Sequence, residues 1–176
     1  MADLRKALDY VLGWEGGLSD HPSDHGGKTN LGITQAALDA ARKARPKAGY
    51  PKDVADLSTE QAVDIYSRDY VPKGWDGILD QAVATVYLDM AVNSGPGRAT
   101  TLLQRALCAT GNPVNVDGSF GPKTLAALNA ADPSQLIGAY QQQRVAFYTH
   151  LVDSDPTQAV FLRGWLRRAN NIPVEV

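Results

Sequence analysis

One stretch of the sequence, residues 79–92, is apolar around most of a helical circumference and reads LDQAVATVYLDMAV. The apolar side chains on these faces are Val83, Val86, Leu88, Met90 and Val92. A helix that is apolar all round is buried among other elements, whereas a surface helix keeps a polar face. The stretch therefore predicts a central buried helix around which the rest of the fold is built.

Helical patterns continue on both sides of this stretch. An amphipathic helix begins near the N-terminus and carries Leu8 and Val11 on its apolar face. Ser58 and Gln61 have the spacing of a capping box, so a helix begins there, and it should end before Pro72. The other predicted helices cover residues 35–45, 98–109, 132–152 and 157–169.

The segment before residue 35 departs from the helical pattern. Residues 16–34 are rich in glycine and aspartate and have no helical period, which indicates a loop or a short hairpin. Residues 30–34, Asn-Leu-Gly-Ile-Thr, are the best candidate for a strand. The predicted fold class is mainly α with one small β-hairpin near residues 18–34.

The composition excludes several classes of protein. The chain has 176 residues, of which 44% are hydrophobic, and a formal net charge of −2, so it lacks the basic surplus of a dedicated nucleic-acid binder. Cys108 is the single cysteine and cannot form an intrachain disulfide. Because His21, His25 and His150 do not have metal-ligand spacing, we expect no metal site, and we also expect no organic cofactor.

The sequence also bears on location. It contains no run of 18 apolar residues, and residues 1–12 alternate charged with apolar side chains, unlike a secretory leader. We therefore expect synthesis in the cytoplasm of a host cell. Action in the periplasm or cell wall would then require release by another factor.

Glu15 is the first candidate catalytic residue. It closes the first predicted helix in the stretch Trp14-Glu15-Gly16-Gly17. The negative end of the helix dipole and the neighbouring indole would hold its proton on, as a general acid requires. The alternative is a glycine C-cap beside a solvated carboxylate, and the spacing alone does not separate the two interpretations.

A second carboxylate follows closely in the sequence. Asp20 and Asp24 both lie within nine residues of Glu15. Glycoside hydrolysis commonly uses one carboxylic acid to protonate the leaving oxygen and a second carboxylate on the opposite side of the bond. Aspartates in loops are also typical of simple turns, because the side chain bonds its own backbone.

These residues belong to a pattern that resembles glycoside hydrolase family 108, the N-acetylmuramidases once labelled secretion activators. The first motif joins Glu15-Gly16-Gly17 to residues 22–34, PSDHGGKTNLGIT. The later motifs, in order, are the tyrosine-rich residues 66–75, residues 89–99, and residues 103–107 with 116–124. The last of them resembles a companion peptidoglycan-binding segment, and together the motifs span nearly the whole chain.

The resemblance implies a lysozyme-like helical fold and an endolysin activity that lyses bacterial cells. Such an enzyme cleaves the β-1,4 bond between N-acetylmuramic acid and N-acetylglucosamine in the glycan strands of peptidoglycan. The implied organisation is a catalytic region at residues 1–95 with a peptidoglycan-binding-like region at 96–176 packed on it. We expect a monomer that binds peptidoglycan and no nucleic acid.

The resemblance also implies roles for single residues. It assigns the general acid to Glu15. A looser similarity to phage lysozymes, with the spacing Glu, eight residues, Asp, five residues, Thr, places the second carboxylate at Asp24. The final position of that spacing is Asn30 here, with the threonine one residue earlier at Thr29. The resemblance therefore implies Thr29 as the third catalytic residue and Asn30 as a substrate contact. Asp20 is the alternative second carboxylate and otherwise a substrate contact.

Two more substrate contacts are implied, at Tyr70 and Asn93. A tyrosine ring can stack on a sugar face, although aromatic residues at helical spacing are more often part of a core. An asparagine at the end of a helix is also typical of a cap.

The last predicted helix has a cationic face with Arg163, Arg167 and Arg168 and no acidic residue between residues 161 and 168. Such a segment is attracted to anionic envelope surfaces, and tryptophan and phenylalanine favour the interface. The favoured alternative is a packed terminal helix whose Phe161 and Trp165 face the core.

Two rival functions are compatible with the same fold. One is a non-catalytic peptidoglycan-binding or secretion-accessory protein, which would bind murein sacculi without degrading them. The other is a chitinase-type glycosidase, which the chemical nature of the cut ends would reveal.

Overall fold

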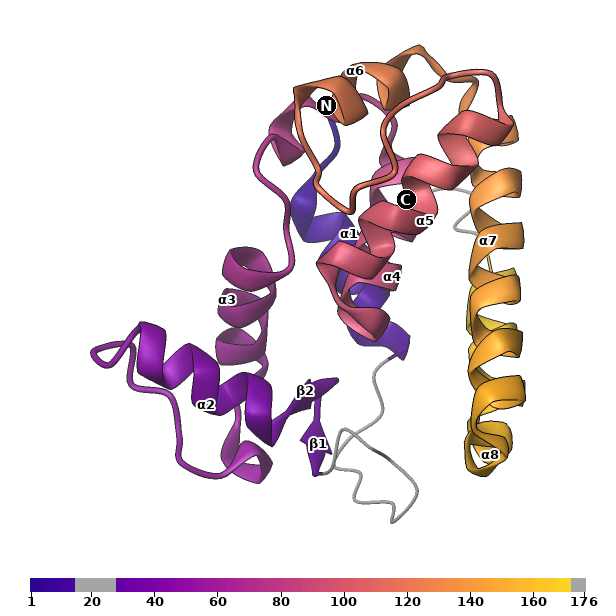
Figure 1. The fold of residues 1–176 in the computed structure, drawn as a ribbon. Helices are drawn as coiled ribbons and strands as arrows, with labels where there is room; N and C mark the ends of the chain where they lie inside the picture. The colour runs from indigo at the N-terminus through magenta and orange to yellow at the C-terminus, as the bar shows by residue number, and fades with distance from the viewer. Residues whose placement is uncertain (15–27, 172–176) are drawn as a thin grey trace.

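The computed structural model describes residues 1–14 and 28–171 of the chain. In these ranges the fold is helical apart from one two-stranded antiparallel sheet and three short 3-10 turns (Figure 1). The helices are α1 (Leu4–Trp14), α2 (Gln35–Ala44), α3 (Thr59–Asp69), α4 (Gln81–Ser94), α5 (Pro96–Ala109), α6 (Pro122–Ala130), α7 (Pro133–Ser154) and α8 (Ala159–Asn170). The predicted fold class, mainly α with one small hairpin, is confirmed.

Helix α4 is the central element, as its apolar sequence predicts. All of its residues from 83 to 92 are buried, and it packs against α1, α5 and α7. The helix begins at Gln81 because the Asp80 side chain accepts a hydrogen bond from the Val83 amide, 2.8 Å away, as an N-cap. Leu79, which the sequence placed inside the helix, precedes this cap and is 62% exposed.

Caps also fix the ends of other helices. Ser58 and Gln61 form the predicted capping box at the start of α3, and Asp132 caps α7 with Pro133 at its first position. In Figure 1, α2, α3 and the hairpin lie on one side of the central pair α1 and α4, and α7 and α8 lie on the other. None of the described helices combines the length and the apolar character needed to span a membrane.

The hairpin corrects the expectation of a single strand at residues 30–34. Strands β1 (Thr29–Asn30) and β2 (Ile33–Thr34) pair with Thr29 opposite Thr34 and Asn30 opposite Ile33. The turn between them has positive φ at Leu31 (51°) and Gly32 (74°), as in type I′ hairpin turns.

A leucine at positive φ costs ~1–2 kcal/mol, so Leu31 is not a residue that indicates a turn. Two contacts offset that cost. The Leu31 carbonyl accepts a 2.6 Å hydrogen bond from the buried Tyr66 hydroxyl, and the Leu31 side chain packs against the core. Tyr66 is thus the core residue that its helical spacing indicates.

Candidate functional site

A cavity of about 460 Å³ lies between the hairpin and the C-terminal helices. One wall consists of Thr29, Gly32 and Thr34 from the hairpin with Tyr70 at the end of α3. The C-terminal end of α4 and the start of α5 contribute its middle, and α7, α8 and the turn between them form the opposite wall. The residues of these two parts are Val92, Asn93, Ser94, Gly95, Tyr148, Leu151, Gln158, Phe161 and Trp165.

Three of the residues singled out in the sequence meet in this cavity. Thr29, Tyr70 and Asn93 come from the hairpin, α3 and α4, and all three line it. Asn30 does not belong to the lining, although it neighbours Thr29 in the chain. Glu15, Asp20 and Asp24 lie outside the described residues.

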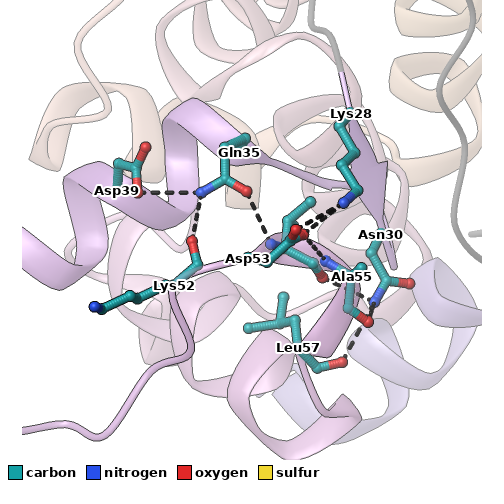
Figure 2. A network of polar contacts seen from close by, with 9 residues as sticks. Lys28, Asn30, Gln35, Asp39, Lys52, Asp53, Ala55 and Leu57 are labelled. Carbon is teal, nitrogen blue, oxygen red and sulfur yellow. Dashed lines mark hydrogen bonds and ion pairs between the residues drawn. The ribbon is translucent and has the colours of Figure 1, made fainter.

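Polar contacts hold the hairpin wall in place (Figure 2). The Lys28 ammonium lies 2.7 and 2.8 Å from the two carboxylate oxygens of Asp53. Asp53 caps the 3-10 turn Val54–Asp56 by accepting a hydrogen bond from the Ala55 amide at 2.8 Å. These contacts lower the pKa of the Asp53 carboxyl, through the Lys28 hydrogen bond first and the Ala55 amide second.

Asn30 belongs to the same network. Its Nδ2 atom donates to the backbone carbonyls of Val54, Ala55 and Leu57, at 3.0, 3.2 and 3.4 Å. The structure thus gives the Asn30 amide a bracing role, whereas the resemblance placed Asn30 among the substrate contacts.

Gln35, the first residue of α2, joins the network from the other side. Its Oε1 accepts from the Val54 amide at 2.8 Å, and its Nε2 donates to the Lys52 carbonyl at 2.8 Å and to Asp39 at 3.1 Å (Figure 2). The hairpin and the start of α2 are therefore tied to the loop before α3 by two side-chain amides and one ion pair.

Tyr70 stands at the C-cap of α3, on the same side of the cavity. Its ring meets the ring of Tyr66 edge-on, with centroids 5.3 Å apart. Partial burial raises the pKa of the Tyr70 hydroxyl, so the side chain stays neutral and offers both a hydroxyl and an apolar face.

Asn93 is hydrogen-bonded to Tyr148 in the opposite wall of the cavity. Its Oδ1 accepts a 2.7 Å hydrogen bond from the Tyr148 hydroxyl of α7 and a longer one, 3.3 Å, from Ser94. Burial raises the pKa of Tyr148, which keeps its hydroxyl protonated as a donor.

Sequence reasoning did not place the aromatic side chains of the C-terminal wall in a site. The Tyr148 and Trp165 rings are stacked at 5.3 Å with a 23° interplanar angle, and Phe161 lies 5.7 Å from Trp165. Phe161 and Trp165 occur at i, i+4 spacing, which is equally typical of a core helix, so the packed interpretation was favoured. The structure packs Trp165 against the core, and both Phe161 and Trp165 line the cavity.

One helical turn away from this wall lies a buried ionic cluster. The Asp89 carboxylate of α4 contacts Arg144 Nη2 of α7 and, at 2.7 Å, Arg168 Nε of α8. All three residues are buried. Burial is the largest influence on the pKa of Arg144 and lowers it, but the Asp89 carboxylate together with Tyr148 and Tyr140 outweighs burial, so the pKa is raised. This corrects the prediction for Arg168, because a cation that is buried against Asp89 is not available to an anionic envelope surface.

The described residues contain no group of three or more His, Cys, Asp or Glu side chains arranged to hold a metal ion. The candidate site there consists of hydroxyls, amides and aromatic rings.

Comparisons with known proteins agree with this picture. The family model described as Glycosyl hydrolase 108 matches residues 8–95, and the model described as Predicted Peptidoglycan domain matches residues 98–170. Among solved structures, that of Brucella abortus SagA shares 33% sequence identity and a TM-score of 0.75, over 94% of this chain and 88% of that one. A search of curated proteins gives no match.

Both matched segments line the cavity, the first with Thr29, Tyr70 and Asn93 and the second with Tyr148 and Trp165. The chain belongs to glycosyl hydrolase family 108 and is a peptidoglycan hydrolase with a peptidoglycan-binding segment.

Proposed function

We propose that the cavity between the hairpin and α7–α8 binds the glycan strand of peptidoglycan, and that the enzyme cleaves the β-1,4 bond between N-acetylmuramic acid and N-acetylglucosamine. The observation that supports this best is the convergence of Thr29, Tyr70 and Asn93, which are distant in the sequence, on one cavity. Hydroxyls, an amide and aromatic faces suit a neutral sugar chain.

In the proposed mechanism, Glu15 is the general acid. It follows Trp14, the last residue of α1, in the chain, and the Trp14 ring lies 5.4 Å below the Arg167 guanidinium of α8. Glu15 protonates the glycosidic oxygen as positive charge develops at the anomeric carbon. Asp24 activates water or stabilises that charge, with Thr29 nearby, and Asp20 contacts substrate.

Analysis of the products tests the proposed bond. Wild-type enzyme is incubated with purified peptidoglycan, and the released fragments are reduced and analysed by mass spectrometry. Fragments that end in reduced N-acetylmuramic acid are expected. Fragments that end in reduced N-acetylglucosamine would contradict the proposed bond and favour the chitinase-type alternative. Protein that pellets with sacculi without lowering their turbidity would support the non-catalytic rival.

The choice of second carboxylate has its own test. Asp24→Asn should lose at least about a hundredfold in the rate of reducing-sugar release if Asp24 acts on the water or on the developing charge. Asp20→Asn is the matched control and should lose far less. Near-normal activity of Asp24→Asn together with an inactive Asp20→Asn would transfer the role to Asp20.

We further propose that the enzyme acts as an endolysin of bacteriophage or prophage type, made in the host cytoplasm as a monomer and released to the wall. The resemblance to endolysins supports this proposal. Expression in a bacterial host with and without a co-expressed membrane pore tests it, since lysis should require both proteins. Lysis without the pore would contradict it.

Contact with the anionic envelope is proposed for Arg163 and Arg167, with Arg168 removed from the set. Both side chains are exposed on α8, close to Val160, which is 64% exposed. The variant Arg163→Gln, which leaves the contact between Arg167 and Trp14 in place, should lyse intact Gram-negative cells more slowly than wild type while degrading isolated peptidoglycan equally well. A control pair at exposed positions elsewhere, Lys47→Gln/Arg105→Gln, should leave both rates unchanged. Equal lysis of intact cells by all three proteins would contradict the proposal.

A further inference from the structure

The contact between Asn93 and Tyr148 joins the two family segments inside the cavity. Asn93 is the next-to-last residue of α4, the helix that closes the segment at residues 8–95, and Tyr148 lies in the C-terminal half of α7 in the segment at residues 98–170. A 2.7 Å hydrogen bond from the Tyr148 hydroxyl to Asn93 Oδ1 therefore connects the two segments.

The hydrogen bond determines which way the Asn93 amide faces. The Tyr148 side chain is 1% exposed, so its hydroxyl must find an acceptor within the protein. Besides Asn93, its neighbours are the Met90 sulfur at 3.4 Å, a weak acceptor, and the Ser94 hydroxyl, whose hydrogen bond favours the ionised form of Tyr148, as a donor's does. Ser94 Oγ also donates to Asn93 Oδ1. With Oδ1 held by these two hydroxyls, Nδ2 faces away from Tyr148.

The Asn93 Nδ2 atom is the donor left over for a ligand. Within the part of the chain that the structure describes, Nδ2 donates to no other group, and Asn93 lines the cavity. An acceptor oxygen on a sugar, either a hydroxyl or an acetamido carbonyl, would satisfy it.

Tyr148 is itself held from several sides. Its ring stacks on the ring of Trp165. One helical turn before Asn93 on α4 and before Tyr148 on α7, the Asp89 carboxylate contacts Arg144, and Arg168 of α8 contacts the same carboxylate. We call Asp89, Arg144 and Arg168 the ionic layer, and Asn93, Tyr148 and Trp165 the cleft layer. The ionic layer fixes the spacing of α4, α7 and α8, so the hydroxyl of Tyr148 reaches Asn93 in one orientation.

We propose that Tyr148 is a positioning residue that orients the Asn93 amide toward an acceptor oxygen of the glycan. The peptidoglycan-domain segment then completes the catalytic cleft and does more than tether the enzyme to the wall. This inference rests on the proposed function, in which Asn93 contacts substrate.

The test is a double-mutant cycle in the full-length protein, with soluble peptidoglycan fragments as substrate. Tyr148→Phe removes one oxygen atom and should lower kcat/KM about tenfold, the order expected for one hydrogen bond that aligns a substrate contact. Asn93→Ala should lower kcat/KM at least as much. Tyr148→Phe should cause no further loss in the Asn93→Ala background, because the amide it orients is gone.

Tyr140→Phe is the matched control. Tyr140 lies two turns earlier on α7, is equally buried, and donates its hydroxyl to the Ala99 carbonyl at 3.1 Å, outside the cavity lining. Its removal should lower the melting temperature about as much as Tyr148→Phe does and leave kcat/KM unchanged. All rates are compared well below the melting temperature of each variant.

The outcomes distinguish failure of the inference about Tyr148 from failure of the proposed function. Equal losses of kcat/KM in Tyr148→Phe and Tyr140→Phe would reduce Tyr148 to a packing residue and overturn the inference. A full tenfold loss from Tyr148→Phe in the Asn93→Ala background would also overturn it, because Tyr148 would then act without Asn93. Wild-type enzyme that releases no glycan fragments would contradict the proposed function itself.

Discussion

The two walls of the cleft are built in opposite ways. The hairpin wall is held by half-exposed polar contacts, namely the Lys28–Asp53 ion pair and the amides of Asn30 and Gln35. The C-terminal wall is held by stacked aromatic rings above a buried ionic layer. Exposed pairs contribute little to stability and leave freedom to move, whereas a buried charge cluster tolerates no loss of a partner. We expect the C-terminal wall to be the rigid template and the hairpin wall the adjustable one.

The largest expected effect comes from breaking the ionic layer. Asp89→Asn leaves two buried guanidinium groups without a counter-charge and should lower the free energy of unfolding by about 3–5 kcal/mol. Urea denaturation measures it. The control is Asp9→Asn, which removes an exposed ion pair with Arg5 and should change stability hardly at all. Similar losses in the two variants would contradict the contrast between buried and exposed charge.

The aromatic stack should give the next largest effect. Trp165→Ala removes a half-buried ring from Tyr148 and Phe161 and should cost about 2–3 kcal/mol of stability, below the range for fully buried tryptophans. It should also raise KM for soluble glycan fragments, because the cavity loses part of its wall. Trp165→Phe should recover part of the lost stability and part of the increase in KM. Lost stability with unchanged KM and kcat would leave Trp165 as a core residue only.

A smaller effect is expected on the other wall. Asn30→Ala leaves carbonyls of the loop before α3 without their donor and should cost about 1 kcal/mol. KM should rise only a few-fold, through a looser hairpin. A hundredfold fall in kcat/KM with an unchanged melting temperature would contradict the bracing role and return Asn30 to the substrate contacts.

The smallest effect is a pH dependence of the hairpin wall. The pKa of Asp53 is lower in the folded protein than its ordinary value near 4, so its contribution to stability is present above that value and is lost as pH falls through the lower folded value. Wild type should therefore lose slightly more stability than Asp53→Asn between about pH 5 and pH 3. Parallel melting curves for the two proteins over that interval would contradict the prediction.

The parts of the fold that were predictable are those whose signal is local. A few neighbouring residues are enough to indicate each of three elements: the apolar run of α4, the Ser58–Gln61 capping box of α3, and the Asp132-Pro133 start of α7. The Leu31 turn was missed because leucine is a poor residue at positive φ, and the hydrogen bond that supports it comes from Tyr66, 35 positions away.

The candidate site was predictable to a smaller extent. The family resemblance indicates Thr29, Tyr70 and Asn93 as site residues, and all three line one cavity. The C-terminal wall was missed, because Tyr148 and Trp165 become neighbours of Asn93 only when α7 and α8 pack on α4. Arg168 was misassigned for the same reason, since its partner Asp89 lies 79 positions away and an arginine on an amphipathic helix carries no sign of burial.

Release of reducing sugar from purified peptidoglycan by wild type and by Glu15→Gln, with Glu60→Gln as a folded control, tests the proposed mechanism most directly. Fragments are expected from wild type and from Glu60→Gln, and the rate should fall about a hundredfold or more in Glu15→Gln with an unchanged melting temperature. Undiminished release by a folded Glu15→Gln protein would contradict the proposed mechanism.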